Sequence, residues 1–351
     1  MNKQKSINQD LPKALFVGNG IHRAFPDNAV SWSNLLAQLR DSNTVRQLMR
    51  GIENVNLSNP LKPFPFAFEE LINNGEDGNE NCIKILKEEI SRIFITQIEN
   101  NLNPFNEFHQ RIMNSSVTDV ITSNYDYGFE MAIWDDFLDN PQQKRQASLN
   151  NLEKTKSIFR GYEIIKPDES FVKVWHMHGE LFNSRNNQNT IYDFPEQSIL
   201  IGYSHYGKYL SEIKDFVEGN YKNYDNIYKR INNNDNLGHS WIDNFFTHNL
   251  DIVGLGLGFE EQDLWWLINY RADKINSNLQ RDNFAPNRIR FFIRKYEHLA
   301  NDEDERFRNK IDWFKNDAIK EILTSLKVEV REIETDTWPQ FYSLVLNEIL
   351  D

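Results

Sequence analysis

The chain has 351 residues, of which 39% are hydrophobic and 13% aromatic. This length suits one large domain, and the apolar content is enough for a substantial core. The formal net charge is −13 with no strong run of Lys or Arg, which disfavours non-specific binding to nucleic acid or to an anionic membrane.

Cysteine content and the first residues bear on the compartment. Cys82 is the only cysteine, so neither a disulfide within the chain nor a Cys-x-x-Cys zinc site can form. The N-terminal stretch MNKQKSINQD is polar, with no apolar signal core behind it. No stretch approaches the roughly 18 apolar residues that span a bilayer. We therefore expect a soluble cytoplasmic protein.

Short apolar runs alternate with longer segments of helical spacing along the chain. Strands are expected within 14–20, 117–123, 170–179, 251–258, 288–295 and 327–334, and helices within 31–39, 82–102 and 338–350. This alternation predicts an α/β fold, with a Rossmann-like, mostly parallel sheet and helices on both faces. We expect one domain over 1–351, with helical insertions near 41–110, 135–170 and 207–245. Ligands of such sheets bind beyond the carboxyl ends of the strands.

The first stretch that bears on chemistry is VGNGIHR, at 17–23. Gly18 and Gly20 let the backbone pass close to a ligand, and a glycine turn that leads into a helix presents N–H groups to phosphate. The dinucleotide pattern Gly-x-Gly-x-x-Gly is incomplete, because Arg23 stands where the third glycine belongs. A tight turn after a strand explains the glycines equally well.

The second stretch is TSNYD, at 122–126. Asn124 and Asp126 are two residues apart, so in extended backbone their side chains point the same way. They would face a ligand at the end of a buried strand. Alternatively, they form a turn or cap the next helix, as Asn and Asp commonly do.

The third stretch is VWHMHGEL, at 174–181. His176 and His178 face one side of an extended strand, and neutral histidine is a common metal ligand. No cysteine is nearby and no third ligand is evident, so a general base or proton shuttle is favoured over a metal. His176 can equally be a satisfied histidine of the interior.

The fourth stretch, VGLGLGFEEQDLWWLI, covers 253–268. Gly254 and Gly256 lie where a strand is expected to end. Glu260, Glu261 and Asp263 follow on the first turn of a helix, where negative charge suits the helix dipole. The bulky residues after them are interpreted as core packing.

The order of these four stretches resembles the sirtuin-like family, in which Gly-Ala-Gly, Thr-Gln-Asn-Ile-Asp, His-Gly and Gly-Thr-Ser follow one another. Further stretches are similar to its bacterial branch of NAD-consuming antiphage defence proteins. They are SWSNLL, FAFEELI (66–72), ILIGYSHYGKYL (199–210) and GFEEQDLWWL (258–267). The resemblance spans about 14–270 and implies a Rossmann-like NAD⁺-binding fold.

The resemblance also implies residue roles. Asn124 would order a water or the nicotinamide ribose, His178 rather than His176 would be the catalytic histidine, and Asp126 would help to hold the nicotinamide end. The remaining implied contacts with the dinucleotide fall on Gly18, Asn19, Gly20, Thr122, Gly254 and Gly256.

This sequence departs from the family pattern at several positions. Asn19 replaces the usual Ala, His22 stands near the family's Ser, and Gly256 stands where the late motif has Ser. Protein-deacylating members carry four cysteines for a structural zinc, and one cysteine cannot supply that site. The missing zinc module argues against lysine deacylation and for hydrolysis of NAD⁺.

The chemistry of this cleavage fits the two catalytic residues. Breaking the nicotinamide–ribose bond leaves a positively charged sugar and a neutral leaving group, so the site must hold the ribose and aim a water at it. Asn124 can position the water and His178 can accept its proton, with no metal required. We expect an NAD⁺ glycohydrolase. The alternatives are an NAD⁺ or ADP-ribose sensor without turnover, and a protein ADP-ribosyltransferase or deacylase.

An unrestrained NAD⁺ hydrolase would kill its host, so we expect its activity to be gated. The resemblance implies a homo-oligomer, or control by a separate protein such as a ring-shaped ATPase. Neither direct nucleic-acid binding nor membrane binding is expected.

Overall fold

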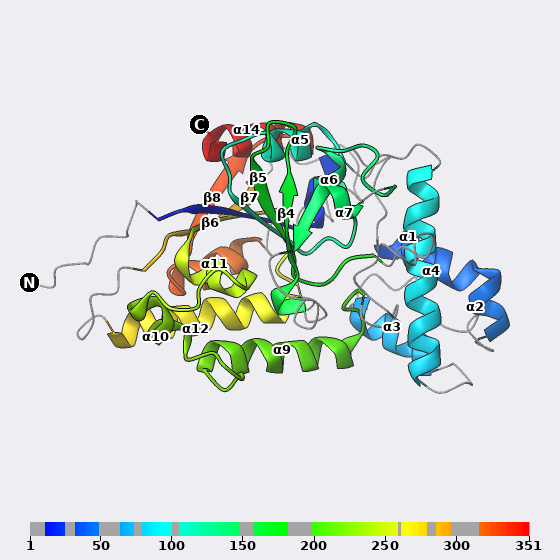
Figure 1. Ribbon diagram of the computed structural model, residues 1–351, viewed down its shortest axis with the longest axis horizontal. Coiled ribbons are helices and arrows are strands. Elements are labelled where there is room, and N and C mark those ends of the chain that lie inside the picture. Colours follow the sequence, from blue (N-terminus) through cyan, green and yellow to red (C-terminus); the bar gives the residue numbers. More distant parts are fainter. Residues whose placement is uncertain are drawn as a thin grey trace, which may run out of the picture.

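The computed structural model describes eleven segments of the chain. They are 11–24, 32–48, 64–73, 79–99, 105–139, 141–147, 157–181, 198–258, 261–278, 286–295 and 316–350. The strands within them are β1 (Lys13–Val17), β2 (Asp119–Thr122), β3 (Arg145–Ala147), β4 (Gly161–Ile165), β5 (Phe171–His176), β6 (Asn249–Val253), β7 (Ile289–Lys295) and β8 (Glu329–Glu334). They form one sheet in the order β3-β4-β5-β2-β1-β6-β7-β8 (Figure 1).

The sheet is mostly parallel. β1 pairs in parallel with both β2 and β6, and the parallel pairing continues to β5 on one side and to β7 and β8 on the other. β3 and β4 add an antiparallel edge next to β5. Without these two, the strands lie in the order third, second, first, fourth, fifth, sixth. That is the order of doubly wound dinucleotide-binding sheets, and it reverses at β1.

Helices cover the sheet and extend it at one end (Figure 1). The α-helices are α1 (Trp32–Asp41), α2 (Asn43–Leu48), α3 (Phe64–Asn73), α4 (Asn79–Glu99), α5 (Glu107–Met113), α6 (Gly128–Met131), α7 (Pro141–Lys144), α9 (Tyr203–Glu218), α10 (Ile227–Asn233), α11 (Trp241–Thr247), α12 (Gln262–Asn278) and α14 (Trp338–Leu350). Two 3₁₀ helices, η1 (Asn19–Ala24) and η4 (Ser157–Phe159), are also present, and the backbone over 316–325 is helical as well.

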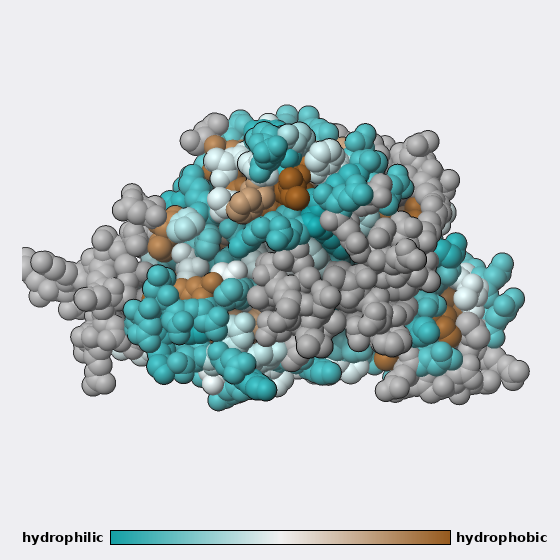
Figure 2. Space-filling model, in the orientation of Figure 1, coloured by the Kyte–Doolittle hydropathy of each residue, from teal (hydrophilic) through white to brown (hydrophobic). Residues whose placement is uncertain are grey.

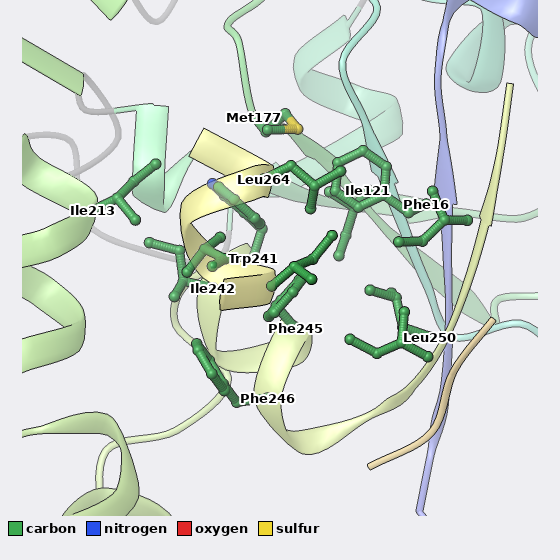
Figure 3. Close-up of a cluster of buried hydrophobic side chains, with 14 of the residues drawn as sticks. Phe16, Ile121, Met177, Ile213, Trp241, Ile242, Phe245, Phe246, Leu250 and Leu264 are labelled. Carbon is green, nitrogen blue, oxygen red and sulfur yellow. The ribbon is translucent and has the colours of Figure 1, made fainter. Parts of the chain in front are cut away.

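One face of the sheet packs against α9, α11 and α12. Because strand side chains alternate between the two faces, Phe16 and Ile121 point into this core. Trp241 of α11 meets Phe16 edge to face, with ring centroids 6.3 Å apart, and Leu264 of α12 lies in the same cluster (Figure 3). Edge-to-face contact is a favoured geometry for aromatic pairs.

The opposite face packs against α5 and α14. Leu15 and Val120, next in sequence to the residues that face the first core, join Ile112 of α5 and Val345 of α14 in a second cluster. The predicted α/β sheet with helices on both faces is therefore confirmed.

Helices α1–α4 form an extension beside the sheet (Figure 1). Leu36 of α1, Phe68 of α3 and Leu86 of α4 belong to a third cluster of buried side chains. Tyr125 and Leu181, from the segments that follow β2 and β5, belong to the same cluster. The extension therefore packs directly on the carboxyl-end loops of two central strands.

Two of the predicted insertions differ from the structure. The segment 135–170 was expected to be helical but holds β3 and β4, because Tyr162 and Ile164 alternate with outward residues and face the second core. A Cβ on Gly161 would lie 2.3 Å from the Trp175 ring, so glycine is needed for β4 to pair with β5. The segment 207–245 is helical as expected. It packs directly on one face of the sheet, however, and is therefore part of the main core rather than an insertion outside it.

The described surface on the side seen in Figure 2 is mostly hydrophilic, with small hydrophobic areas between polar ones. Phe66 of α3 and Tyr203 of α9 are exposed and stack on each other, with ring centroids 5.1 Å apart. Among the described helices, none is both long and apolar enough to cross a membrane.

Candidate functional site

The four stretches singled out in the sequence meet at one edge of the sheet. Because the central strands are parallel, the turns after β1, β2, β5 and β6 all leave the sheet at its carboxyl edge. Thr122 pairs with His176 in the register of β2 and β5. Asn124 and His178 therefore each lie two residues beyond this pair, on neighbouring loops.

Backbone hydrogen bonds hold these two loops together. Met177 N–H donates to the Thr122 carbonyl at 3.0 Å, and Leu181 N–H donates to the Tyr125 carbonyl at 3.0 Å. The loops therefore continue side by side beyond the ends of the strands.

The carboxamide of Asn124 is buried and unsatisfied. The residue is 5% exposed, and neither its Oδ1 nor its Nδ2 has a hydrogen-bond partner in the part of the chain that the structure describes. Its backbone is fixed, because Asn124 N–H donates to Thr122 Oγ1, which itself donates to the Val17 carbonyl, both at 3.0 Å. Burying an amide without partners costs free energy, so this arrangement suits a ligand that would supply them.

Thr122 was predicted to contact the dinucleotide. Its hydroxyl is fully buried and bonded on both sides, to the backbone of Val17 and of Asn124. This geometry gives Thr122 a positioning role, because it ties β1 to the loop that carries Asn124.

Asp126 performs the turn function that was one interpretation of this stretch. Its Oδ1 accepts the N–H of Gly128 at 2.8 Å, at the start of α6, and its Oδ2 lies 3.1 Å from Nε2 of His22. Burial alone would raise the pKa of Asp126, but the charge and hydrogen bond of His22, with further contributions from His109 and Gly128, hold it below its usual value. Burial and the nearby charge of His22 lower the pKa of His109 to about 3.

His178 pairs with a carboxylate that lies 85 positions further along the chain. Its Nε2 is 2.9 Å from Oδ2 of Asp263, and both side chains are buried. Oδ1 of Asp263 accepts the N–H of Leu264 at 2.9 Å, within the first turn of α12. The rings of Tyr206 and Tyr209 meet the imidazole edge to face, at centroid distances of 5.3 and 6.1 Å.

His176 is a satisfied histidine of the interior. Its Nε2 lies 2.7 Å from Oε1 of Glu130, and its Nδ1 lies 3.4 Å from the carbonyl oxygen of Asn124. Burial acts to lower the pKa of His176, but the charge and hydrogen bond of Glu130 raise it above its ordinary value. The imidazole thus contacts the backbone of the Asn124 loop and helps to hold it in place.

Another buried ion pair lies beside His176. Glu180 accepts hydrogen bonds from Arg145 of β3 and from the Tyr162 hydroxyl of β4, each at 2.7 Å. Although burial opposes it, the charge of Arg145 leads the interactions that lower the pKa of Glu180 to about 2. Gly179, just before it, has a φ of 91°, and a Cβ there would lie 2.2 Å from the Ser198 carbonyl oxygen.

The two glycine turns pack against each other. Gly18 N–H donates to the Val253 carbonyl at 2.9 Å, and Gly20 N–H donates to the Gly254 carbonyl at 2.8 Å. A Cβ on Gly18 or Gly20 would come within 2.5 or 2.7 Å of the Gly254 backbone. Close packing of the turns therefore explains these glycines, and their two N–H groups are engaged within the protein. Contacts of Gly18, Gly20 and Gly254 with a dinucleotide stay predictions.

The remaining predicted positions lie in the same two turns. Asn19 is half-buried and opens η1, while Gly256 is exposed in the turn after β6. Glu260 lies outside the described residues. Glu261 accepts the N–H of Gly258 at 2.6 Å, a hydrogen bond just before the start of α12. Contacts of Asn19 and Gly256 with a dinucleotide also stay predictions.

Sequence reasoning missed Asp263 and Glu130 as partners of the two histidines. Asp263 was interpreted only as an acid that suits a helix N-terminus, and nothing in the sequence marked Glu130. Both pairings join residues far apart in the chain. Among the described residues, no group of three or more His, Cys, Asp or Glu side chains is arranged to hold a metal ion.

Comparisons with known proteins add no family to this description. No family model matches the chain, and no curated protein matches it. The resemblance to sirtuin-like proteins therefore depends on the four sequence stretches and their order.

Proposed function

We propose that this chain is an NAD⁺ glycohydrolase that cleaves the bond between nicotinamide and ribose. Asn124 and His178 would act at the reacting carbon. The observation that carries the proposal is the Asn124 carboxamide, which is buried beside the His178 loop with both of its polar atoms lacking a partner among the described residues.

The strand order supports a dinucleotide as the substrate. Open sheets with this order bind dinucleotides beyond the carboxyl ends of the strands, where the order reverses. Here the reversal is at β1, and the Asn124 loop follows the adjacent strand β2. A dinucleotide that crosses this edge would bring its nicotinamide half toward the neighbouring loops after β2 and β5.

The two side chains suit the cleavage chemically. Positive charge develops on the ribose as the bond breaks, and nicotinamide leaves without charge, so no strong acid is needed. Asn124 can orient a water or a ribose hydroxyl through its carboxamide and stay neutral throughout. His178 can accept the proton that the water loses. Aligning the water with the anomeric carbon is the main task of the site.

The proposal is tested by incubating the purified protein with NAD⁺ and measuring nicotinamide and ADP-ribose by chromatography. Asn124→Ala and His178→Ala should each abolish release of nicotinamide. Asn269→Ala, an exposed change on α12, is the matched control and should turn over like the wild type. Intact NAD⁺ under every activating condition, or undiminished turnover in both site variants, would contradict the proposal. Tight NAD⁺ binding without turnover would favour a sensor module.

The proposal includes a role in antiphage defence, as the sequence resemblance implies, with activity gated by oligomerisation or by a partner protein. Supporting this, α1, α3 and α4 share a buried cluster with Tyr125 and Leu181, on the two loops that carry Asn124 and His178. A protein that moved this extension would therefore displace the catalytic loops. Nicotinamide release should increase when the protein encoded next to this chain is added. If the rate of nicotinamide release does not change and the chain forms oligomers by itself, gating by oligomerisation is favoured.

A further inference from the structure

We infer that Asp263 positions His178 and makes Nδ1 the nitrogen that accepts the proton in the reaction. This inference rests on the proposed function, and it adds a residue to which the resemblance assigned no role in the reaction, together with a specific atom. Asp263 would act through His178 and would not touch the substrate.

The hydrogen bond between the two residues determines the tautomer. An ionised carboxylate can only accept hydrogen bonds, so Oδ2 of Asp263, 2.9 Å from Nε2 of His178, requires the proton to be on Nε2. The lone pair of the neutral imidazole is then on Nδ1. The side-chain hydrogen bond of His178 within the described residues uses Nε2, which leaves Nδ1 available to a water.

The surroundings support a charged Asp263 and a fixed ring. The carboxylate lies in the first turn of α12, where it accepts the Leu264 N–H and is favoured by the helix dipole. Tyr206 and Tyr209 contact the His178 ring edge to face. Burial, followed by neighbouring groups that include Asp263, raises the pKa of both tyrosines well above the ordinary value, so neither competes as a base.

The other histidine of the motif provides a comparison within the same protein. His176 is also paired with a carboxylate, Glu130, but its second nitrogen faces the Asn124 carbonyl. Both of its nitrogens are therefore engaged. Of the two histidines, only His178 combines a carboxylate partner on one nitrogen with an open position on the other.

Asp263→Asn tests the inference in the turnover assay. The amide can donate to Nε2 and so favour the wrong tautomer, and we expect kcat to fall at least about tenfold while KM changes little. Loss of the negative charge disfavours the imidazolium, so the acid limb of the pH–kcat profile should move to lower pH. Asp273→Asn removes an exposed carboxylate from the same helix and should leave both properties unchanged. Wild-type kcat in Asp263→Asn, or a lower kcat with an unmoved acid limb, would overturn the inference.

A second measurement does not depend on turnover. In wild-type protein with ¹⁵N-labelled histidine, the His178 signals, identified by their loss in His178→Ala, should show the proton on Nε2 in the neutral ring. A proton on Nδ1 would overturn the inference even if NAD⁺ is cleaved. If NAD⁺ is not cleaved at all, the proposed function fails while the tautomer is still decided. The same spectrum decides the matter if Asp263→Asn does not fold.

Discussion

Replacing Asn124 by alanine should separate activity from stability. A buried asparagine normally forms hydrogen bonds, and its removal destabilises the fold. Asn124 instead has two buried polar atoms that lack partners among the described residues. Asn124→Ala should therefore abolish nicotinamide release while leaving the free energy of unfolding unchanged or raising it.

The magnitude follows from the two effects of the substitution. Removing an unsatisfied buried amide recovers about 1–3 kcal/mol. Truncation of the side chain leaves a space of roughly 30 Å³, which costs about 0.7 kcal/mol at ~24 cal/mol per Å³. The net effect is a stabilisation of between about zero and 2 kcal/mol, which raises Tm by a few degrees at most.

Asn287→Ala is the matched control, because this asparagine is buried and fully bonded. Its Oδ1 accepts from Arg271 at 2.9 Å, and its Nδ2 donates to the carbonyls of Phe245 and His248 at 2.9 and 2.6 Å. Losing three hydrogen bonds should cost about 3 kcal/mol. Urea unfolding of both variants in the absence of NAD⁺ measures the difference. A loss of stability in Asn124→Ala as large as that in Asn287→Ala would show that the Asn124 amide is satisfied, and would refute the reasoning.

Two further predictions concern the buried charges beneath the site. The pKa of His176 is raised above 6.5 by Glu130, so the stabilisation from this pair is fully present below about pH 6.5 and is lost as the pH rises through the raised value. The Tm difference between wild type and Glu130→Gln should therefore be larger at pH 6 than at pH 9, and a difference independent of pH would contradict this. Arg145→Ala leaves Glu180 buried without its cation and should cost about 3–5 kcal/mol in urea unfolding. Arg46→Ala removes half of an exposed pair and should cost far less, because water screens exposed charges. Equal losses of stability in the two variants would argue against a stabilising role for the buried pair.

Strand positions were predictable where a parallel strand is buried on both faces, as β1, β2, β6 and β7 are along most of their length. Such strands appear as short apolar runs that end in polar or glycine residues. β2, β5 and β7 fall within the expected segments, and β1 and β6 begin one and two residues before theirs. β4 was missed for the opposite reason. It lies at the antiparallel edge, and Glu163 and Ile165 point away from the core, so its sequence contains no continuous apolar run.

The partners of the two histidines could not be predicted from local patterns. His178 follows β5 and Asp263 lies in α12, which follows β6, while β2 and β1 separate β5 from β6 in the sheet. The contact between the two residues therefore depends on the order of the strands and on the path of α12. The strand order is a tertiary property. The sequence does place polar residues at strand ends, but which ends become neighbours depends on how the sheet is assembled.

Some polar groups at the carboxyl edge are hydrogen-bonded within the protein, and others lack a partner among the described residues. Thr122, Asp126 and His176 have their hydrogen-bonding atoms engaged within the protein. Other buried atoms of the described chain lack partners, but Asn124 is the one side chain there with two such atoms. A site that served only to support the sheet would gain stability by satisfying this amide. The Asn124 carboxamide lacks partners and lies beside an imidazole with one free nitrogen, as a binding or catalytic role would require. If both groups were hydrogen-bonded within the protein, there would be no reason to place catalysis at this edge.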